Sequence, residues 1–132
     1  MQLLLDTHTL IWFLEDNPLL KTKSKQLIED ETNDIFVSAV SFYEMSIKIS
    51  IGKLILPDSL EFTIEKTIEK DIKIIDLNRH HSIQYQTIPL LPDHRDPFDR
   101  MLIAIAVHED LTIISADEKF KNYTSIIHLI EA

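Results

Sequence analysis

Four acidic residues lie where predicted segments of the chain meet, and their positions suggest metal chemistry. Asp6 ends the first apolar run, and Asp117 follows the last long apolar run. Glu44 and Asp99 lie near the starts of two predicted helices. Ligands bind at the carboxyl ends of strands in open parallel sheets, so Asp6 and Asp117 are expected to meet there. Clustered carboxylates repel one another unless a divalent cation lies between them, and the pattern therefore predicts a magnesium-type site.

The composition limits both the class of protein and the kind of metal site. A chain of 132 residues with 45% hydrophobic content suits one domain, residues 1–132, with a single core. There is no cysteine, so only carboxylate, imidazole and carbonyl ligands remain, which favours a hard cation. No apolar stretch approaches the roughly 20 residues that span a bilayer, and the start of the chain lacks the basic residues of a signal peptide. We expect a cytoplasmic protein that does not contact a membrane.

The net charge disfavours generic adhesion to nucleic acid. The chain carries 22 acidic and 13 basic residues, for a formal net charge of −9. Bound cations would neutralise part of an acidic site, and a local basic rim can still steer a polyanion toward it. The candidates for such a rim are Lys48, Lys53, Arg79, Arg95 and Arg100.

Strands are predicted to alternate with helices along the chain. The predicted strands cover residues 2–6, 35–38, 72–77, 111–115 and 126–130. The predicted helices cover residues 7–14, 19–31, 39–51, 58–70, 80–87 and 97–109. The helix over 39–51 is predicted to bury the face that carries Val40, Tyr43, Ile47 and Ile51. The alternation predicts a parallel sheet sandwiched between helices.

Two of the acids also fit a purely structural role. Asp96, Pro97 and Asp99 match a helix start, in which we expect Asp96 to cap the helix and Asp99, one turn later, to bind metal. Ser41 and Glu44 match the spacing of a capping box. Glu44 nevertheless borders a face that is expected to be buried, where a cation would be a suitable partner. The sequence leaves both roles open for Glu44.

The two acids at strand ends could likewise start the helices that follow them. Thr7 could supply the cap after the first strand, or it could hold the Asp6 carboxylate through its hydroxyl. Asp117 could open a helix instead of binding metal. His8 is close to Asp6 in sequence, and His80-His81 lacks the spacing of a zinc site, so the roles of these histidines stay open.

Three functional classes fit these residues. A metal-dependent phosphodiesterase or nuclease would use the carboxylates to hold cations that activate water. A phosphoaspartyl phosphatase of the haloacid-dehalogenase type would use Asp6 as a nucleophile, but such enzymes normally have a second Asp two positions later, where this chain has His8. A catalytically silent interaction domain would use the acids as helix caps and as a surface for a basic partner.

Five stretches of the chain, in order, match one protein family. They are Leu3–Trp12, Val37–Lys48, Gly52–Leu54, His94–Ala104 and Ser115–Asp117. The most specific is the stretch that begins His94-Arg95-Asp96-Pro97-Phe98-Asp99-Arg100. On these residues the chain resembles the PIN-domain family, and within it the VapC-type toxins of bacterial toxin–antitoxin pairs, from residue 2 to about residue 130.

The resemblance implies a fold, an activity and partners. The fold is α/β, a three-layer α/β/α arrangement with a central, mainly parallel five-stranded sheet. The activity is that of an endoribonuclease dependent on Mg²⁺ or Mn²⁺, which cleaves tRNA, rRNA or mRNA. The partners are the RNA substrate, a second copy in a homodimer, and a cognate antitoxin that covers the acidic site. DNA is contacted only indirectly, through the antitoxin.

The resemblance also assigns roles to residues. The acidic quartet that binds metal and performs catalysis maps onto Asp6, Glu44, Asp99 and Asp117. The residues expected to support it are Thr7, Asp96 and Ser115. Apart from the resemblance, we expect Arg95, Arg100 and Lys48 to face substrate or antitoxin because of their charge, although Lys48 could equally form an ordinary surface salt bridge.

Overall fold

The computed structural model describes residues 1–132 and alternates strands with helices. The strands are β1 (Gln2–Leu5), β2 (Asp34–Ser38), β3 (Lys73–Ile75), β4 (Thr112–Ser115) and β5 (His128–Glu131). The α-helices are α1 (Thr7–Leu14), α2 (Thr22–Glu29), α3 (Ala39–Ser50), α4 (Leu60–Glu69), α5 (Arg79–Tyr85) and α6 (Pro97–Glu109). A 3-10 helix, η1 (Glu118–Tyr123), lies between the last two strands. The predicted α/β fold is confirmed.

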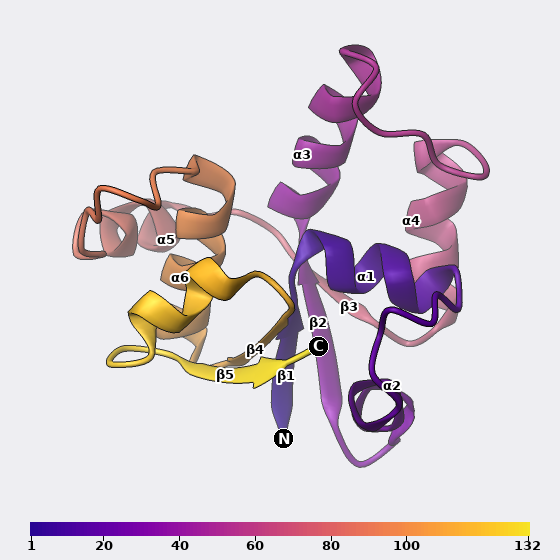
Figure 1. Cartoon of the computed structure of the whole chain (residues 1–132), viewed down its shortest axis with the longest axis horizontal. Coiled ribbons are helices and arrows are strands. Elements are labelled where there is room, and N and C mark those ends of the chain that lie inside the picture. The colour runs from indigo at the N-terminus through magenta and orange to yellow at the C-terminus, as the bar shows by residue number, and fades with distance from the viewer.

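The five strands form one sheet in the order β3-β2-β1-β4-β5, and every neighbouring pair is parallel (Figure 1). The first strand therefore lies at the centre. Its last residue, Leu5, pairs with Val37 on one side and with Ile114 on the other. The strand ends that precede Asp6, α3 and the 115–117 segment consequently meet at one edge of the sheet.

Helices cover both faces of the sheet, and β1 contributes to the core on each side. Leu3 and Leu5 pack in a cluster with residues of α1, α2 and α3, whereas Leu4 packs in a cluster with residues of α6 and η1. Burial on both faces explains why the strand reads as a continuous apolar run instead of an alternating one. Figure 1 shows α1, α2 and α4 on one side of the sheet and α5, α6 and η1 on the other.

Helix α3 buries only part of the predicted face: Val40 is buried and Ile47 is half-buried, as expected, but the other two residues are not. Tyr43 and Ile51 are 64% and 59% exposed, while Phe42, Glu44 and Met45 are buried. The true inner face carries polar side chains, which hydropathy alone assigns to solvent. The prediction failed in part because these polar groups find hydrogen-bond partners in the core, which removes the cost of burying them.

Two further differences concern helix limits and one helix face. Helix α2 begins at Thr22, not at residue 19, because Asn17 accepts a hydrogen bond from the amide of Leu19 and turns the chain there. In α4 the apolar side chain of Ile68 is exposed, whereas Thr67 is buried with its hydroxyl donating to the carbonyl of Thr63. No helix in the chain combines the length and apolar character needed to cross a membrane.

Candidate functional site

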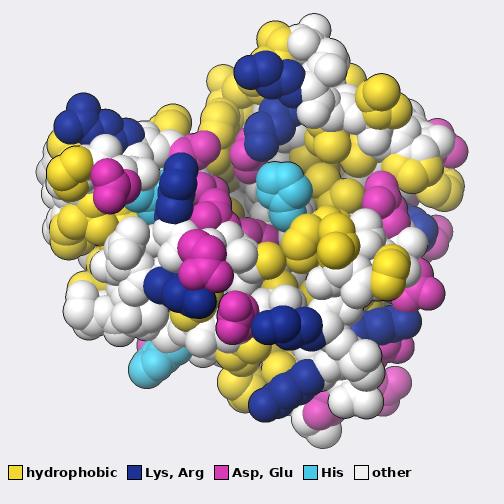
Figure 2. All heavy atoms as spheres, in the orientation of Figure 1, with side chains coloured by type: hydrophobic (Ala, Val, Ile, Leu, Met, Phe, Trp, Pro, Cys, Tyr) yellow, Lys and Arg dark blue, Asp and Glu magenta, His cyan; other side chains and the backbone are white.

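The acidic residues gather at the carboxyl edge of the sheet, where α1, α3 and α6 begin. Figure 2 shows acidic side chains in the hollow between the α3 side and the α5–α6 side of the molecule, with basic side chains at its border. The acids reach this edge from separate segments of the chain, and each has its own set of partners. The three buried or half-buried acids are Asp6, Glu44 and Asp99.

Asp6 is buried and is held by two neutral donors. It is the N-cap of α1, and its Oδ1 accepts a hydrogen bond of 2.9 Å from the amide of Thr9. Its Oδ2 accepts a short hydrogen bond of 2.5 Å from the hydroxyl of Ser115 at the end of β4. Burial raises the pKa of Asp6, while the bonds from Ser115 and Thr9 act in the opposite direction. The side chain is therefore both a cap and part of the acidic edge.

Ser115 links the two central strand ends. Its hydroxyl donates to Asp6 and accepts a hydrogen bond of 3.0 Å from the amide of Asp117. The Asp117 side chain is exposed, and its carboxylate accepts from the amide of Lys119 as the N-cap of η1. Ser115 therefore connects the Asp6 carboxylate to the backbone of Asp117, and both residues lie at the same edge of the sheet.

Glu44 is buried in the second turn of α3, and both of its oxygens have partners. The hydroxyl of Thr7 donates to Oε1 at 2.7 Å, and the ammonium of Lys48 lies 2.8 Å from Oε2. The hydrogen bond that Lys48 donates to Glu44 raises the pKa of Lys48, and the more distant charges of Asp96 and Asp99 add to this. The Lys48 ammonium is therefore influenced by acids of α6 and its cap as well as by Glu44.

Two local predictions for this part of the site are wrong. Thr7 neither caps α1 nor holds Asp6, because its hydroxyl is used by Glu44. Ser41 and Glu44 do not form a capping box, because α3 is capped by the Ser38 side chain one turn earlier. The hydroxyls of Ser41 and Thr7 are instead 2.9 Å apart, so Ser41 belongs to the support of Glu44.

Asp99 is the acid with the least internal compensation. Its Oδ2 lies 3.0 Å from Nε2 of His94, and no hydrogen bond within the chain reaches its Oδ1. Burial raises the pKa of Asp99 to about 6; the His94 bond lowers it, and the charges of Asp96 and Asp117 raise it further. Asp96 itself is exposed and caps α6, accepting from the amides of Phe98 and Asp99.

The prediction for Arg100 is wrong. Its side chain is buried, with the guanidinium donating to the carbonyls of Ile88 and Pro89 and lying over the ring of Tyr85. A side chain in this position cannot face a substrate or an antitoxin. It fastens the loop that precedes α6. Arg95, by contrast, is exposed one residue before the cap of α6, and its predicted role stays a prediction.

Sequence reasoning missed one polar residue of the site, His94. It is fully buried and contacts Asp99 directly. Its position in the most specific matching stretch, five residues before Asp99, was the available signal. Thr9 was also missed, because a backbone amide that binds a carboxylate leaves no trace in side-chain chemistry.

The oxygen-rich donor set fits a hard divalent cation that keeps part of its water shell. No three His, Asp or Glu side chains lie close enough together to surround a metal ion by themselves. Mg²⁺ commonly binds through one or two carboxylates and keeps several waters, so a complete protein cage is not required. Asp99 has a free oxygen and a pKa raised in part by neighbouring acids, and a cation would relieve that repulsion.

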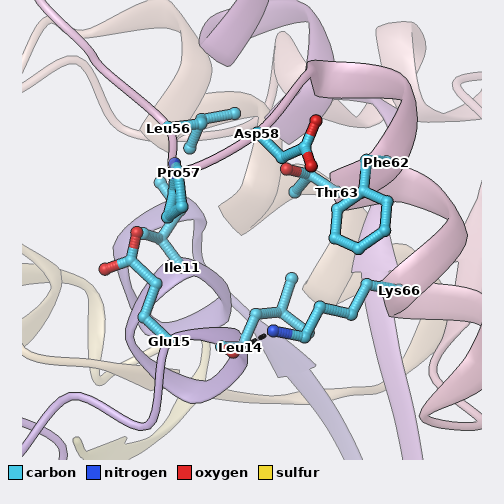
Figure 3. A pocket seen from close by; sticks show the side chains of 9 residues that line it. All are labelled: Ile11, Leu14, Glu15, Leu56, Pro57, Asp58, Phe62, Thr63 and Lys66. Atoms are coloured by element: carbon cyan, nitrogen blue, oxygen red, sulfur yellow. Dashed lines mark hydrogen bonds between the residues drawn. The ribbon is translucent and has the colours of Figure 1, made fainter.

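A small pocket lies away from the acids, between α1 and α4 (Figure 3). Its volume is about 50 Å³, and the Lys66 ammonium donates across it to the carbonyl of Leu14. Its lining consists of Ile11, Leu14, Glu15, Leu56, Pro57, Asp58, Phe62, Thr63 and Lys66. None of the four acids of the predicted quartet contributes to it, so we place the candidate site at the sheet edge.

Comparison with known proteins identifies the fold and the family. VapBC2 from Rickettsia felis, in a structure bound to a DNA fragment from the promoter, matches with a TM-score of 0.68 and 18% identity over 98% of each chain. VapBC-1 from nontypeable Haemophilus influenzae matches with a TM-score of 0.65 and 16% identity, over 99% of this chain and 98% of the other. FitAcB from Neisseria gonorrhoeae matches with a TM-score of 0.62 and 16% identity, over 98% and 96%. No curated protein matches in sequence. The family model of the PIN domain matches residues 3–125, and the chain therefore belongs to the PIN-domain family.

Proposed function

We propose that this chain is a metal-dependent endoribonuclease of the VapC type, a toxin that a cognate antitoxin neutralises. The observation that carries the proposal is the state of Asp99 at the carboxyl edge of the sheet. Its carboxylate keeps one oxygen without an internal partner, and its pKa is raised by burial and, to a smaller extent, by the repelling charges of Asp96 and Asp117. A divalent cation would relieve this repulsion, and membership of the PIN-domain family supports a nuclease as the enzyme that uses it.

In the proposed site, Asp99 and Asp6 hold Mg²⁺ or Mn²⁺, and Glu44 and Asp117 complete the binding site or orient its waters. When bound, the cation supplies positive charge that stabilises the phosphodiester as negative charge develops and makes water a better nucleophile. The chain supplies orientation. Asp6 is fixed by two hydrogen bonds, and Glu44 is fixed through both oxygens, so neither carboxylate has to be ordered during the reaction.

Two basic side chains are placed to receive the RNA backbone. Arg95 is exposed one residue before the α6 cap, and Lys48 is 35% exposed beside Glu44. Positive charge at the border of an acidic hollow attracts phosphate locally even when the net charge of the protein is negative. We propose these two residues, without Arg100, as the substrate-facing or antitoxin-facing charges.

The proposed partners follow from the nature of the matched structures. One from Klebsiella pneumoniae, with a TM-score of 0.57 and 17% identity, is a toxin–antitoxin complex, and VapBC2 from Rickettsia felis is bound to promoter DNA. We propose a cognate antitoxin for this chain, contact with DNA only through that antitoxin, and a homodimer.

The experiment that tests the function is cleavage of RNA by the purified chain. Mixed tRNA, rRNA and mRNA are incubated with protein in Mg²⁺, in Mn²⁺ and in EDTA, together with the Asp6→Asn variant. A matched control is Asp71→Asn, an exposed acid with φ of 59°, a conformation that asparagine tolerates. We expect cleavage only with metal, loss in Asp6→Asn and full activity in Asp71→Asn. Cleavage that persists in EDTA or in Asp6→Asn would overturn the proposal.

The same preparation separates the two other functional classes. Release of inorganic phosphate from a small phosphomonoester would indicate a phosphatase. Tight binding of a basic peptide without cleavage of either substrate would indicate an interaction domain.

A further inference from the structure

We infer that His94 is a positioning residue for Asp99, and that its ring holds one carboxylate oxygen so that the other stays available to a divalent cation. The inference rests on the proposed function, because it gives Asp99 the task of binding metal. It adds a residue to the site that acts through Asp99 and does not itself touch the cation or the RNA.

The contact between the two residues is direct and enclosed. Nε2 of His94 lies 3.0 Å from Oδ2 of Asp99, and the imidazole has no exposed surface. The ring lies edge-on to Phe120 and Tyr123, with centroid distances of 5.8 and 5.2 Å. The ring therefore cannot rotate away from Asp99 without displacing packed aromatic side chains.

The position of the imidazole proton follows from the other ring nitrogen. Nδ1 of His94 is buried and has no hydrogen-bond partner. A proton there would be a buried donor without an acceptor, whereas a proton on Nε2 meets the carboxylate of Asp99, which only accepts. We therefore assign the proton to Nε2, so that His94 donates to Oδ2. Oδ1 of Asp99 is then the oxygen that the chain leaves without a donor.

The backbone around His94 is held just as firmly. Its amide donates to the carbonyl of Leu91 at 3.2 Å, and its carbonyl accepts from the hydroxyl of Tyr123 at 3.3 Å. The guanidinium of Arg100 lies 3.5 Å from that hydroxyl and donates to the carbonyl of Pro89 at 2.6 Å. Arg100 is adjacent to Asp99 on α6, so the helix that carries the acid also anchors the loop that carries its donor.

This arrangement differs from the one at Glu44 in a way that matters for metal binding. Lys48 brings a positive charge to Glu44, and that charge opposes a cation. His94, with its proton on Nε2, brings a hydrogen bond to Asp99 without such a charge. Donors that orient a metal-binding side chain in this way typically account for about 10- to 100-fold in metal affinity.

The test is the affinity of the full chain for Mn²⁺, measured by calorimetry in the absence of RNA. His94→Phe keeps an aromatic ring among Phe120 and Tyr123 but removes the donor. His94→Gln keeps an N–H that reaches Asp99, and His94→Asn carries the same amide on a chain one carbon shorter. We expect His94→Phe and His94→Asn to bind Mn²⁺ about 10-fold or more weakly, and His94→Gln to stay within a few-fold of the wild type.

The comparison of His94→Gln with His94→Asn keeps the inference testable if His94→Phe does not fold. Equal Mn²⁺ affinity in the wild type and both amide variants, or equal loss in both, would overturn the inference, because the donor to Asp99 would then not matter. Asp99→Asn serves as the reference for loss of the ligand itself. If Asp99→Asn weakens binding and the His94 variants do not, the inference fails while the proposed function stands. If Asp99→Asn binds Mn²⁺ like the wild type, both fail.

Discussion

Replacing Asp99 by asparagine is expected to stabilise the metal-free protein at neutral pH. Burial, together with the charges of Asp96 and Asp117, raises the pKa of Asp99 to about 6 from 3.8. Below pH 3.8 the carboxyl is protonated in both the folded and the unfolded chain, and it costs no stability. As the pH rises toward 6 the unfolded chain ionises first, so stability from this group is lost between about pH 4 and pH 6.

The size of the effect follows from the same pKa. The difference between 3.8 and about 6 corresponds to about 3 kcal/mol at neutral pH. Asparagine abolishes the charge and can still accept the hydrogen bond from His94 through its side-chain oxygen. It also loses the favourable interaction of a carboxylate with the amino end of α6, which is worth up to about 1 kcal/mol. The expected net gain is about 2 kcal/mol, or roughly 6 °C in Tm.

Urea unfolding in EDTA at pH 7.5 and at pH 4.0 measures this gain. Asp99→Asn should be more stable than the wild type at pH 7.5 and no more stable at pH 4.0. Asp71→Asn, exposed and remote from the acids, should match the wild type at both pH values. If Asp99→Asn is less stable than the wild type at pH 7.5, or equally stabilised at pH 4.0, the reasoning about an uncompensated acidic site is refuted.

Three further changes probe the other parts of the site. Asp6→Asn should lower the rate of RNA cleavage by about 100-fold or more, since loss of a metal ligand removes several kcal/mol of transition-state stabilisation; wild-type rates would exclude Asp6 as a ligand. Arg100→Met should lower the free energy of unfolding by about 3 kcal/mol because it leaves buried carbonyls without a hydrogen-bond donor, whereas Arg95→Met should change it by less than about 0.5 kcal/mol. Urea unfolding of the two variants measures the difference. Equal effects would contradict the role of Arg100 in holding the loop before α6. Lys48→Gln should raise Mn²⁺ affinity in calorimetry by removing a charge 2.8 Å from Glu44, and weaker binding would show instead that Lys48 supports the site.

The fold was predictable because its strands are unambiguous. The apolar run before Asp6 forms the central strand, whose three leucines are fully buried, and such a run is easy to recognise. The start of α6 was equally clear, because Pro97 directly follows the Asp96 cap. The inner face of α3 was not predictable from hydropathy, since it carries Ser41 and Glu44. Their burial depends on Thr7, which lies 34 and 37 residues away in sequence. No local pattern encodes a partner at that distance.

The candidate site was predictable as a set of acids, but not as a set of contacts. Strand ends indicated Asp6, yet the hydroxyl that holds it comes from Ser115, 109 residues later. Arg100 was predicted to face substrate or antitoxin, and an arginine is rarely buried unless its charge is paired. In this chain the Arg100 guanidinium donates to backbone carbonyls and to a tyrosine hydroxyl instead of to a carboxylate. These acceptors reach Arg100 only when the loop before α6 folds against the helix, so the sequence does not reveal them.

The three inner acids are compensated by different chemistry, and this difference ranks them as cation ligands. Glu44 already has a cation, Lys48, so a metal there must displace or oppose an ammonium. Asp6 has only neutral donors, but both of its oxygens are used. Asp99 has a hydrogen bond to one oxygen, a second oxygen without a partner, and a pKa raised by burial and by the charges of Asp96 and Asp117, so a cation offsets the largest uncompensated cost at Asp99. Metal binding should therefore centre on Asp99, with Asp6 as the second ligand and Glu44 contributing after Lys48 has moved.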